Sequence, residues 1–115
     1  MHLSLLIENL TLKPIVLIDG NRTVKGGFVG DLLSYVMGNA SEGDLWFTIQ
    51  THPNVIAVAT LKDLAGVIIC GGRSPEEETI QRAKEVGVNL LTTEEQIFPI
   101  SGRLYQLLNN EWFTP

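Results

Sequence analysis

Short runs of apolar residues alternate with helix-like segments through most of this 115-residue chain, and this alternation constrains the fold most strongly. Apolar runs of strand length recur as "LWFTIQ", "VIIC" and "VNLL", with amphipathic segments between or beside them. Strands without a polar face must be covered on both sides, which parallel strands joined by crossover helices achieve. We therefore predict an α/β fold with a mostly parallel sheet and helices on both faces, forming a single domain over residues 1–115.

The first third of the chain is expected to contain a helix, a strand and a second helix. Apolar spacing predicts a short helix over residues 3–10, and the run "IVLID" predicts a strand over residues 15–19. From Val29 to Ala40 the apolar residues follow helical spacing, which predicts an amphipathic helix over "DLLSYVMGNA". Asp31 is expected to cap the start of that helix.

Residues 54–70 allow two interpretations. The run is apolar enough for a crossover helix over residues 54–64 followed by a strand over residues 67–70, or for a hairpin that turns at Lys62 and Asp63. Pro53 fits a first helical turn, and a parallel connection needs about a dozen residues. We therefore favour the crossover helix.

The segment "SPEEETIQRAKEVG" carries several features of a complete helix. Ser74 is expected at the N-cap, Pro75 at the first helical position, and Gly87 at the stop. A short strand over "VNLL" and a last helix within residues 92–108 follow. Pro99 is expected to kink or divide that last helix.

The net charge of −5 arises from 13 acidic and 8 basic residues, and the basic residues are scattered. Nucleic acid binding is not expected, because it needs a concentrated basic face. The single cysteine, Cys70, lies in an apolar run and is expected to be buried in a protein from a reducing compartment. The start of the chain lacks a basic leader, and no apolar run approaches 18 residues, so we expect a cytoplasmic protein without a membrane span.

Polar residues follow three successive predicted strands. In open α/β sheets, ligands bind outside the carboxyl ends of the strands, where these residues are expected to meet. The guanidinium of Arg73 could hold a carboxylate or phosphate, and the ring of His52 could donate to or accept from a ligand. We name the set the strand-end rim, and it consists of Thr51, His52, Gly72, Arg73 and Thr93.

Each side chain of the strand-end rim also has a purely structural interpretation. The His52-Pro53 pair could simply end a strand, and Thr93 could cap the helix that follows it. Arg73 could pair with Glu76 or a neighbouring glutamate. Those glutamates would also repel a phosphate at the start of their helix, so the "GGR" sequence is not expected to act as a phosphate loop.

The stretch "VKGGFVGD" and the carboxyl-terminal tail are candidates for subunit contacts. Gly26, Gly27 and Phe28 could belong to a bulged or edge strand, to a ligand contact or to a subunit contact, since glycines permit close approach. Trp112 and Phe113 are expected at a self-association surface unless another part of the chain covers them.

Catalytic chemistry has little support in the sequence. The chain has two histidines and one cysteine, and it contains no H-x-x-x-H, C-x-x-C or G-x-S-x-G pattern. G-x-G-x-x-G and P-loop patterns are also missing. We therefore assign no catalytic residue, no metal site and no cofactor.

Residues 22–108 resemble the DRTGG domain family. The resemblance rests on the glycine-containing stretch that leads into "LLSYVMGNA", on the block "EGDLWFTIQTHPNVIAVATLKDLAGVIICGGR", and on the closing "GRLY". The glycine-containing stretch includes Gly30 and Asp31. The nearest match to the residues that give the family its name is made by Arg22, Thr23, Gly26 and Gly27.

The resemblance implies an α/β regulatory or assembly module that is often dimeric. Such domains occur in phosphotransacetylases, in pyrophosphatases that carry CBS domains, and as short stand-alone chains. They are similar in fold to the N-terminal domain of HPr kinase, which lacks that enzyme's catalytic centre. A fold like that of this HPr kinase domain is therefore expected here.

Three functional hypotheses follow. The first is a non-enzymatic regulatory module that forms a homodimer and binds a small anionic metabolite or nucleotide at the strand-end rim. The second is an assembly module without a ligand, which contacts itself or a partner enzyme through the glycine stretch and the tail. The third and least supported is a small enzyme with His52 as its acid or base.

Overall fold

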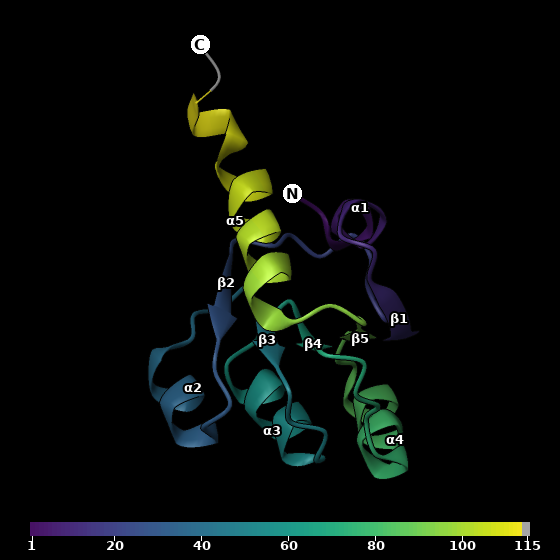
Figure 1. Cartoon of the computed structure of the whole chain (residues 1–115). Helices are drawn as coiled ribbons and strands as arrows, with labels where there is room; N and C mark the ends of the chain where they lie inside the picture. Colours follow the sequence, from purple (N-terminus) through teal and green to yellow (C-terminus); the bar gives the residue numbers. More distant parts are fainter. Residues whose placement is uncertain (114–115) are drawn as a thin grey trace.

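A computed structural model describes residues 1–113, with side chains described through Asn109, and shows a five-stranded sheet between two layers of helices (Figure 1). The strand order is β1-β5-β4-β3-β2. Neighbours among β2, β3, β4 and β5 are parallel, and β1 pairs antiparallel with β5. The strands are β1 (Lys13–Val16), β2 (Gly26–Val29), β3 (Asp44–Thr48), β4 (Gly66–Ile69) and β5 (Leu90–Thr92). The predicted α/β class with a mostly parallel sheet is confirmed.

Helices cover both faces of the sheet, as the apolar strands require. On one face lie α2 (Leu33–Asn39), α3 (Asn54–Leu61) and α4 (Glu77–Val86), and on the other lie α1 (Leu3–Asn9) and α5 (Ile97–Phe113) (Figure 1). No helix in the described part of the chain is long and apolar enough to cross a membrane.

Two hydrophobic clusters, one on each face, hold the layers together. Trp46 packs with residues of α2, α3 and α4, whereas its neighbours Leu45 and Phe47 pack with residues of α1 and α5. The alternation arises because successive side chains of a strand point to opposite faces. Every residue of β3 and β4 is buried, which explains why those segments of the sequence lack a polar face.

The crossover interpretation of residues 54–70 is confirmed. α3 joins β3 to β4, and these two strands pair in parallel, so the alternative hairpin does not form. Pro53 immediately precedes the helix and already has helical backbone angles. The short helices α1 and α2 also lie where apolar spacing predicts them, within one or two residues at most ends.

Two predicted helix caps are wrong. α4 begins at Glu77 instead of after Ser74, with an extended Glu76 at the N-cap whose amide bonds to the Thr51 carbonyl in the loop after β3. Asp31 does not cap α2, which begins at Leu33. Its carboxylate instead accepts hydrogen bonds from the Thr48 hydroxyl at 2.8 Å and the Ile49 amide at 2.9 Å.

Other predicted boundaries also need correction. The first strand covers Lys13–Val16 instead of residues 15–19, and Val29, included in the helical pattern, ends β2. Pro99 neither divides α5 nor removes a helical hydrogen bond, because it is the third residue of a helix that runs to Phe113. The glycine stretch forms β2, an edge strand, as one interpretation of that stretch predicts.

Candidate functional site

The carboxyl ends of four parallel strands meet at one edge of the sheet. The register pairs Thr48 with Ile69 and Ile69 with Thr92, so the loops that follow β3, β4 and β5 leave the sheet side by side. Thr51 and His52 lie in the first of these loops, Gly72 and Arg73 in the second, and Thr93 in the third. The structure therefore brings the loops of the strand-end rim to a common edge.

Two rim residues hold the loops together through their backbones. The Gly72 amide donates to the Thr93 carbonyl at 3.0 Å, and the Gly71 amide donates to the Glu95 carbonyl at 2.7 Å. The Thr93 side chain is buried, and its hydroxyl accepts the Glu95 amide at 3.2 Å. Gly72 has a φ of +72°, and a Cβ there would lie 2.6 Å from a carboxylate oxygen of Glu94. The positive φ favours glycine at this position, whereas the flexible Glu94 side chain could move away from a Cβ.

Thr51 anchors the start of α4. Its carbonyl accepts hydrogen bonds from the buried Thr79 hydroxyl at 2.7 Å and from the Glu76 amide at 3.2 Å. The loop after β3 is thereby tied to the helix that follows β4. Thr51 is half-buried, and the structure gives its backbone a supporting role.

His52 is exposed and has one ring nitrogen engaged. Its Nδ1 accepts a hydrogen bond from the Asn54 amide at 3.1 Å, at the first residue of α3. In a neutral ring this arrangement leaves the proton on Nε2, which can donate. The structural interpretation that His52 ends a strand does not hold, because β3 already ends at Thr48. His52 instead bonds to the first residue of α3 and keeps a donor for a ligand.

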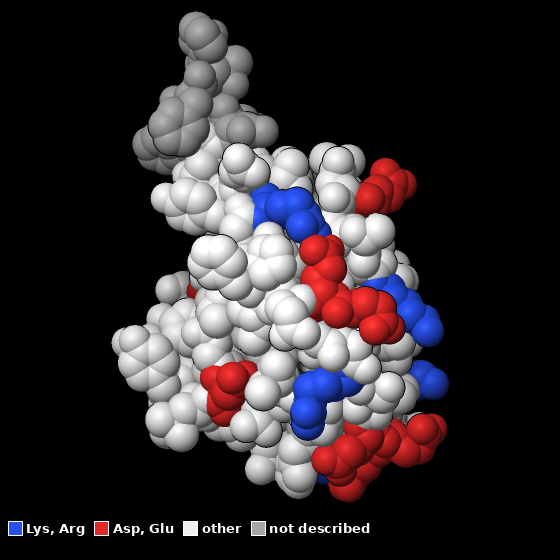
Figure 2. Space-filling view, viewed as in Figure 1, with Lys and Arg blue, Asp and Glu red and all other residues white. Residues whose placement is uncertain are grey.

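Arg73 is the exposed cation of the strand-end rim. Its side chain makes no hydrogen bond or ion pair with any residue that the structure describes, so the expected pairing with Glu76 or its neighbours is not observed. Arg103, by contrast, pairs with Glu95. The face drawn in Figure 2 carries acidic and basic side chains interspersed, without an extended basic patch.

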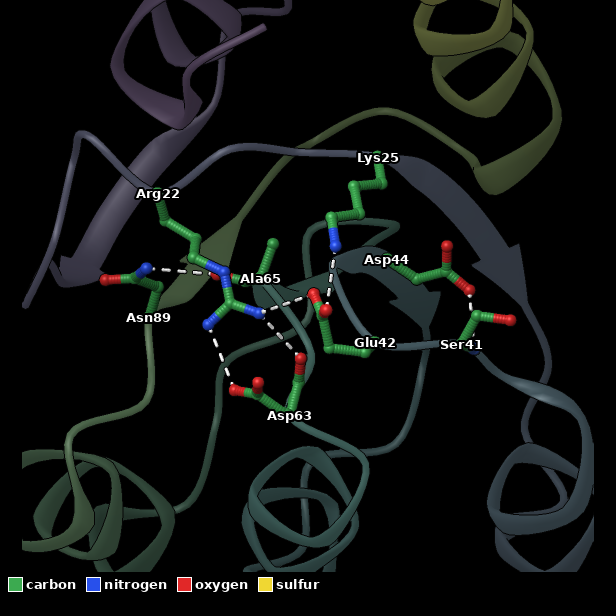
Figure 3. A network of polar contacts seen from close by, with 8 residues as sticks. All are labelled: Arg22, Lys25, Ser41, Glu42, Asp44, Asp63, Ala65 and Asn89. Atoms are coloured by element: carbon green, nitrogen blue, oxygen red, sulfur yellow. Dashed lines mark hydrogen bonds and ion pairs between the residues drawn. The ribbon is translucent and has the colours of Figure 1, made fainter.

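The opposite, amino-terminal edge of the sheet carries a network of polar side chains (Figure 3). The Arg22 guanidinium donates to the Asp63 carboxylate at 3.0 Å and to the Asp63 carbonyl at 2.8 Å. It also lies 3.4 Å from Glu42, whose other oxygen accepts from Lys25 at 2.7 Å. Arg22 thereby links the segment before β2 to the loops before β3 and β4. We name this group of eight residues the amino-edge network, and it consists of Arg22, Lys25, Ser41, Glu42, Asp44, Asp63, Ala65 and Asn89.

Asn89 is a buried member of the amino-edge network, like Asp44 and Ala65. Its carbonyl oxygen accepts the amides of Ile18 at 2.8 Å and Asp19 at 3.1 Å, and its amide group donates to the carbonyls of Asp19 at 3.2 Å and Ala65 at 3.0 Å. Sequence reasoning missed this residue. The amide side chain inside the apolar run "VNLL" could have identified it, because a polar side chain in a buried strand needs hydrogen-bond partners.

An apolar groove lies between β2 and α5, with a cavity volume of about 580 Å³. Gly27 forms part of its floor, and a Cβ there would lie 3.0 Å from Leu104, so glycine permits α5 to approach the edge strand. Phe28 lies on the other face of β2, where its ring centroid is 5.8 Å from that of Tyr35. The predicted interface residues of β2 are therefore divided between two faces. Trp112 and Phe113 lie in α5, but their side chains are outside the described residues.

The site chemistry of residues 1–113 is limited. Within the described residues, no group of three or more His, Cys, Asp or Glu side chains could hold a metal ion. Cys70 is buried at the end of β4, as predicted, and burial raises the pKa of its thiol to about 12. The thiol therefore stays protonated and unreactive near neutral pH.

Comparison with known proteins finds a similar fold among solved structures. No protein-family model matches the chain, and no curated protein matches it in sequence. The fold is similar to a crystal structure of the CBS and DRTGG domains of the regulatory region of Clostridium perfringens pyrophosphatase, complexed with its activator diadenosine tetraphosphate. The TM-score is 0.67 at 19% sequence identity, over 88% of this chain and 44% of that chain. The chain has a DRTGG-like fold and spans less than half of that structure's chain.

Proposed function

We propose that this chain is a non-catalytic regulatory module that forms a homodimer and binds a small anionic metabolite or nucleotide at the strand-end rim. The observation that carries the proposal is the exposed Arg73 guanidinium, which has no partner among the described residues and lies at the carboxyl edge of the parallel sheet. Ligands of open α/β sheets bind at that edge.

The chemistry of the rim suits a small anion. The guanidinium of Arg73 offers a planar fork of donors that can hold two oxygens of a phosphate or carboxylate. The Nε2 of His52 adds a second donor. Glu77 and Glu78 occupy the first turn of α4, so a phosphate would avoid that helix end and bind on the loop side of the rim.

The fold likeness supports a nucleotide as the ligand class. The similar structure belongs to the regulatory region of an enzyme and holds a dinucleotide activator with several phosphate groups. We extend this class of ligand to the present chain. The proposal also includes a single domain over residues 1–115, a cytoplasmic location and control of a partner enzyme.

Calorimetric titration tests the ligand proposal, with diadenosine tetraphosphate and ATP as probes. The double variant His52→Ala with Arg73→Ala should weaken binding of the better probe by at least about tenfold, or about 1.4 kcal/mol. Arg82→Ala removes an exposed guanidinium from the middle of α4 and should leave the affinity unchanged. Equal affinity in the wild type and the rim variant would refute the assignment of the rim.

A second candidate function is assembly without a ligand, which the apolar groove between β2 and α5 favours. In this case the chain binds itself or a partner enzyme, and the rim only stabilises the loops. Deletion of residues 112–115 combined with a substitution of Gly27 should then change the mass measured in solution. A wild-type chain that is monomeric, with a mass unaffected by these changes, would rule out self-assembly.

A further inference from the structure

One face of α5 presents large apolar side chains to solvent. Phe98 is 89% exposed and Tyr105 is 70% exposed. Gly102 lies between them, four residues after the first and three before the second, so all three share one side of the helix. Figure 1 shows that α5 also continues past the end of the sheet. A helix face of this composition is expected to pack against another surface.

The groove beside this helix face carries little charge. Val29 of the edge strand β2 and Leu108 of α5 contribute to its walls. Among the described residues that line the groove, Lys25 alone is charged, and it pairs with Glu42 at 2.7 Å. Figure 2 shows most charged side chains on the side of α4, β5 and β1, with a basic group also beside α5, whereas the side that carries β2 and α2 shows an acidic group near α2 and few other charges.

Gly102 has no reason to be glycine within one copy of the chain. A Cβ at this position would meet no atom within 4 Å, and the residue lies in a helix with no positive φ. Glycine in a helix interior is less stable than alanine by roughly 1 kcal/mol. The smallest side chain does allow a second helix to approach closely, near the lower end of the usual 8–10 Å between helix axes.

We infer that this face binds a second copy of the chain, with the two α5 helices crossing antiparallel at Gly102 on a twofold axis. Rises of about 6 Å and 4.5 Å for four and three residues place Phe98 of one protomer beside the partner's Tyr105. The inference rests on the homodimer of the proposed function and assigns its surface.

A second copy fits this face for two reasons. With a net charge of −5, two copies repel each other wherever their acidic surfaces meet, and contact through the groove, whose described lining has no acidic residue, avoids that repulsion. A twofold contact also needs a patch that complements itself. Bulky Phe98 and Tyr105 beside a small Gly102 and a hollow of about 580 Å³ meet this need.

Oxidative cross-linking of Gly102→Cys tests the inference directly. A residue on a twofold axis lies opposite its own copy, and the native Cys70 is buried and does not compete. Leu61→Cys is the matched control, since Leu61 is 72% exposed on α3, in the opposite helix layer. The Gly102→Cys chain should form covalent dimers at least about tenfold faster than the control, because the dimer holds its two thiols opposite each other, whereas the control thiols meet only by collision.

Tyr105→Arg and Leu61→Arg give a second, independent comparison by sedimentation velocity. The first should weaken dimerisation by at least about tenfold through charge burial, and the second should leave it unchanged. A dimer that survives Tyr105→Arg, or in which both cysteine variants cross-link equally, would overturn this surface while keeping the homodimer. A wild-type chain that is monomeric at the highest concentration tested would overturn both the α5 surface and the homodimer. The same result is expected if a different protein covers the groove.

Discussion

The two edges of the parallel sheet differ in how their polar groups are used. At the amino-terminal edge, the side chains of Arg22 and Asn89 form hydrogen bonds with other residues of the chain. At the carboxyl edge, Arg73 has no partner among the described residues, and His52 has one ring nitrogen engaged. Groups that satisfy one another contribute to stability, whereas groups held at an edge without partners are available for a ligand.

The difference is not between a rigid edge and a loose one. The loops of the carboxyl edge are themselves bonded to each other, as between Gly72 and Thr93, and Thr79 fixes the start of α4 to the loop after β3. The backbone of the rim is therefore held in place, while two of its side chains remain exposed. A backbone that is already held in place removes part of the entropic cost of binding.

The largest predicted effect concerns Asn89. Replacement by alanine removes four hydrogen bonds and leaves the buried Ala65 carbonyl without this donor. We expect a loss of about 3 kcal/mol in the free energy of unfolding, measured by urea titration at fixed protein concentration. Asn39→Ala, at an exposed position in α2, is the control and should cost less than about 1 kcal/mol. Equal losses in both variants would show that the amino edge is not held by Asn89.

Gly72→Ala tests the rigid backbone of the carboxyl edge. The positive φ, which alanine adopts only with strain, should lower the free energy of unfolding by about 2 kcal/mol. Gly38→Ala is the opposite case, because this glycine lies in α2 with no atom within 4 Å of its added Cβ, and it should stabilise the protein by up to about 1 kcal/mol. The same sign for both variants would contradict the strained conformation.

The raised pKa of the Cys70 thiol predicts a loss of stability at alkaline pH. Its folded-state pKa is raised to about 12 from an ordinary value of 9.0, so above pH 9 the unfolded chain releases a proton that the folded chain keeps. Stability from this group is complete below pH 9 and is lost as the pH rises from 9 towards 12. Between pH 8 and 10, wild type should lose about 1 kcal/mol more than Cys70→Ala, by urea unfolding at both pH values. Identical pH dependence of the two proteins would exclude this role.

Arg22→Met should have a smaller effect, of about 1 kcal/mol, because the ion pairs of Arg22 are partly exposed to solvent. Its bond to the Asp63 carbonyl adds to the loss. Arg82→Met provides the control and should change the free energy of unfolding by less than about 0.5 kcal/mol. If both substitutions have the same effect, the Arg22 contacts do not stabilise the amino edge.

The smallest effect on stability is expected for Arg73→Ala. An exposed cation without an ion-pair partner should change the free energy of unfolding by less than about 0.5 kcal/mol, measured without added ligand. A loss greater than 1 kcal/mol would mean that Arg73 supports the fold, and the contrast between the two edges would then disappear.

Much of the fold was predictable from local sequence patterns. The crossover helix α3, the parallel pairing of β3 with β4, and the end of α4 at Gly87 all follow from apolar runs and helix-stop residues. The start of α4 was not predictable in this way. Ser74 and Pro75 favour a helix locally, but Glu76 is extended and its amide bonds to the Thr51 carbonyl, which is distant in the chain.

The edge on which the candidate site lies was predictable from the sequence, but the contacts between its side chains and distant residues were not. Consecutive apolar strands place His52 and Arg73 on one edge, since parallel strands share a direction. The contacts of Arg22 with Asp63, and of Asn89 with Ala65, join residues far apart in the chain. Neither periodicity nor composition specifies such pairs. The groove between β2 and α5 likewise depends on how two distant elements pack.

Native mass spectrometry of the protein, purified gently from its own host, tests the central claim most directly because it reports subunit number and retained small molecules together. We predict a dimer with a discrete added mass that is lost when His52 and Arg73 are both replaced by alanine. An added mass that the double variant retains, or a wild-type chain that is monomeric and carries none, would contradict the account.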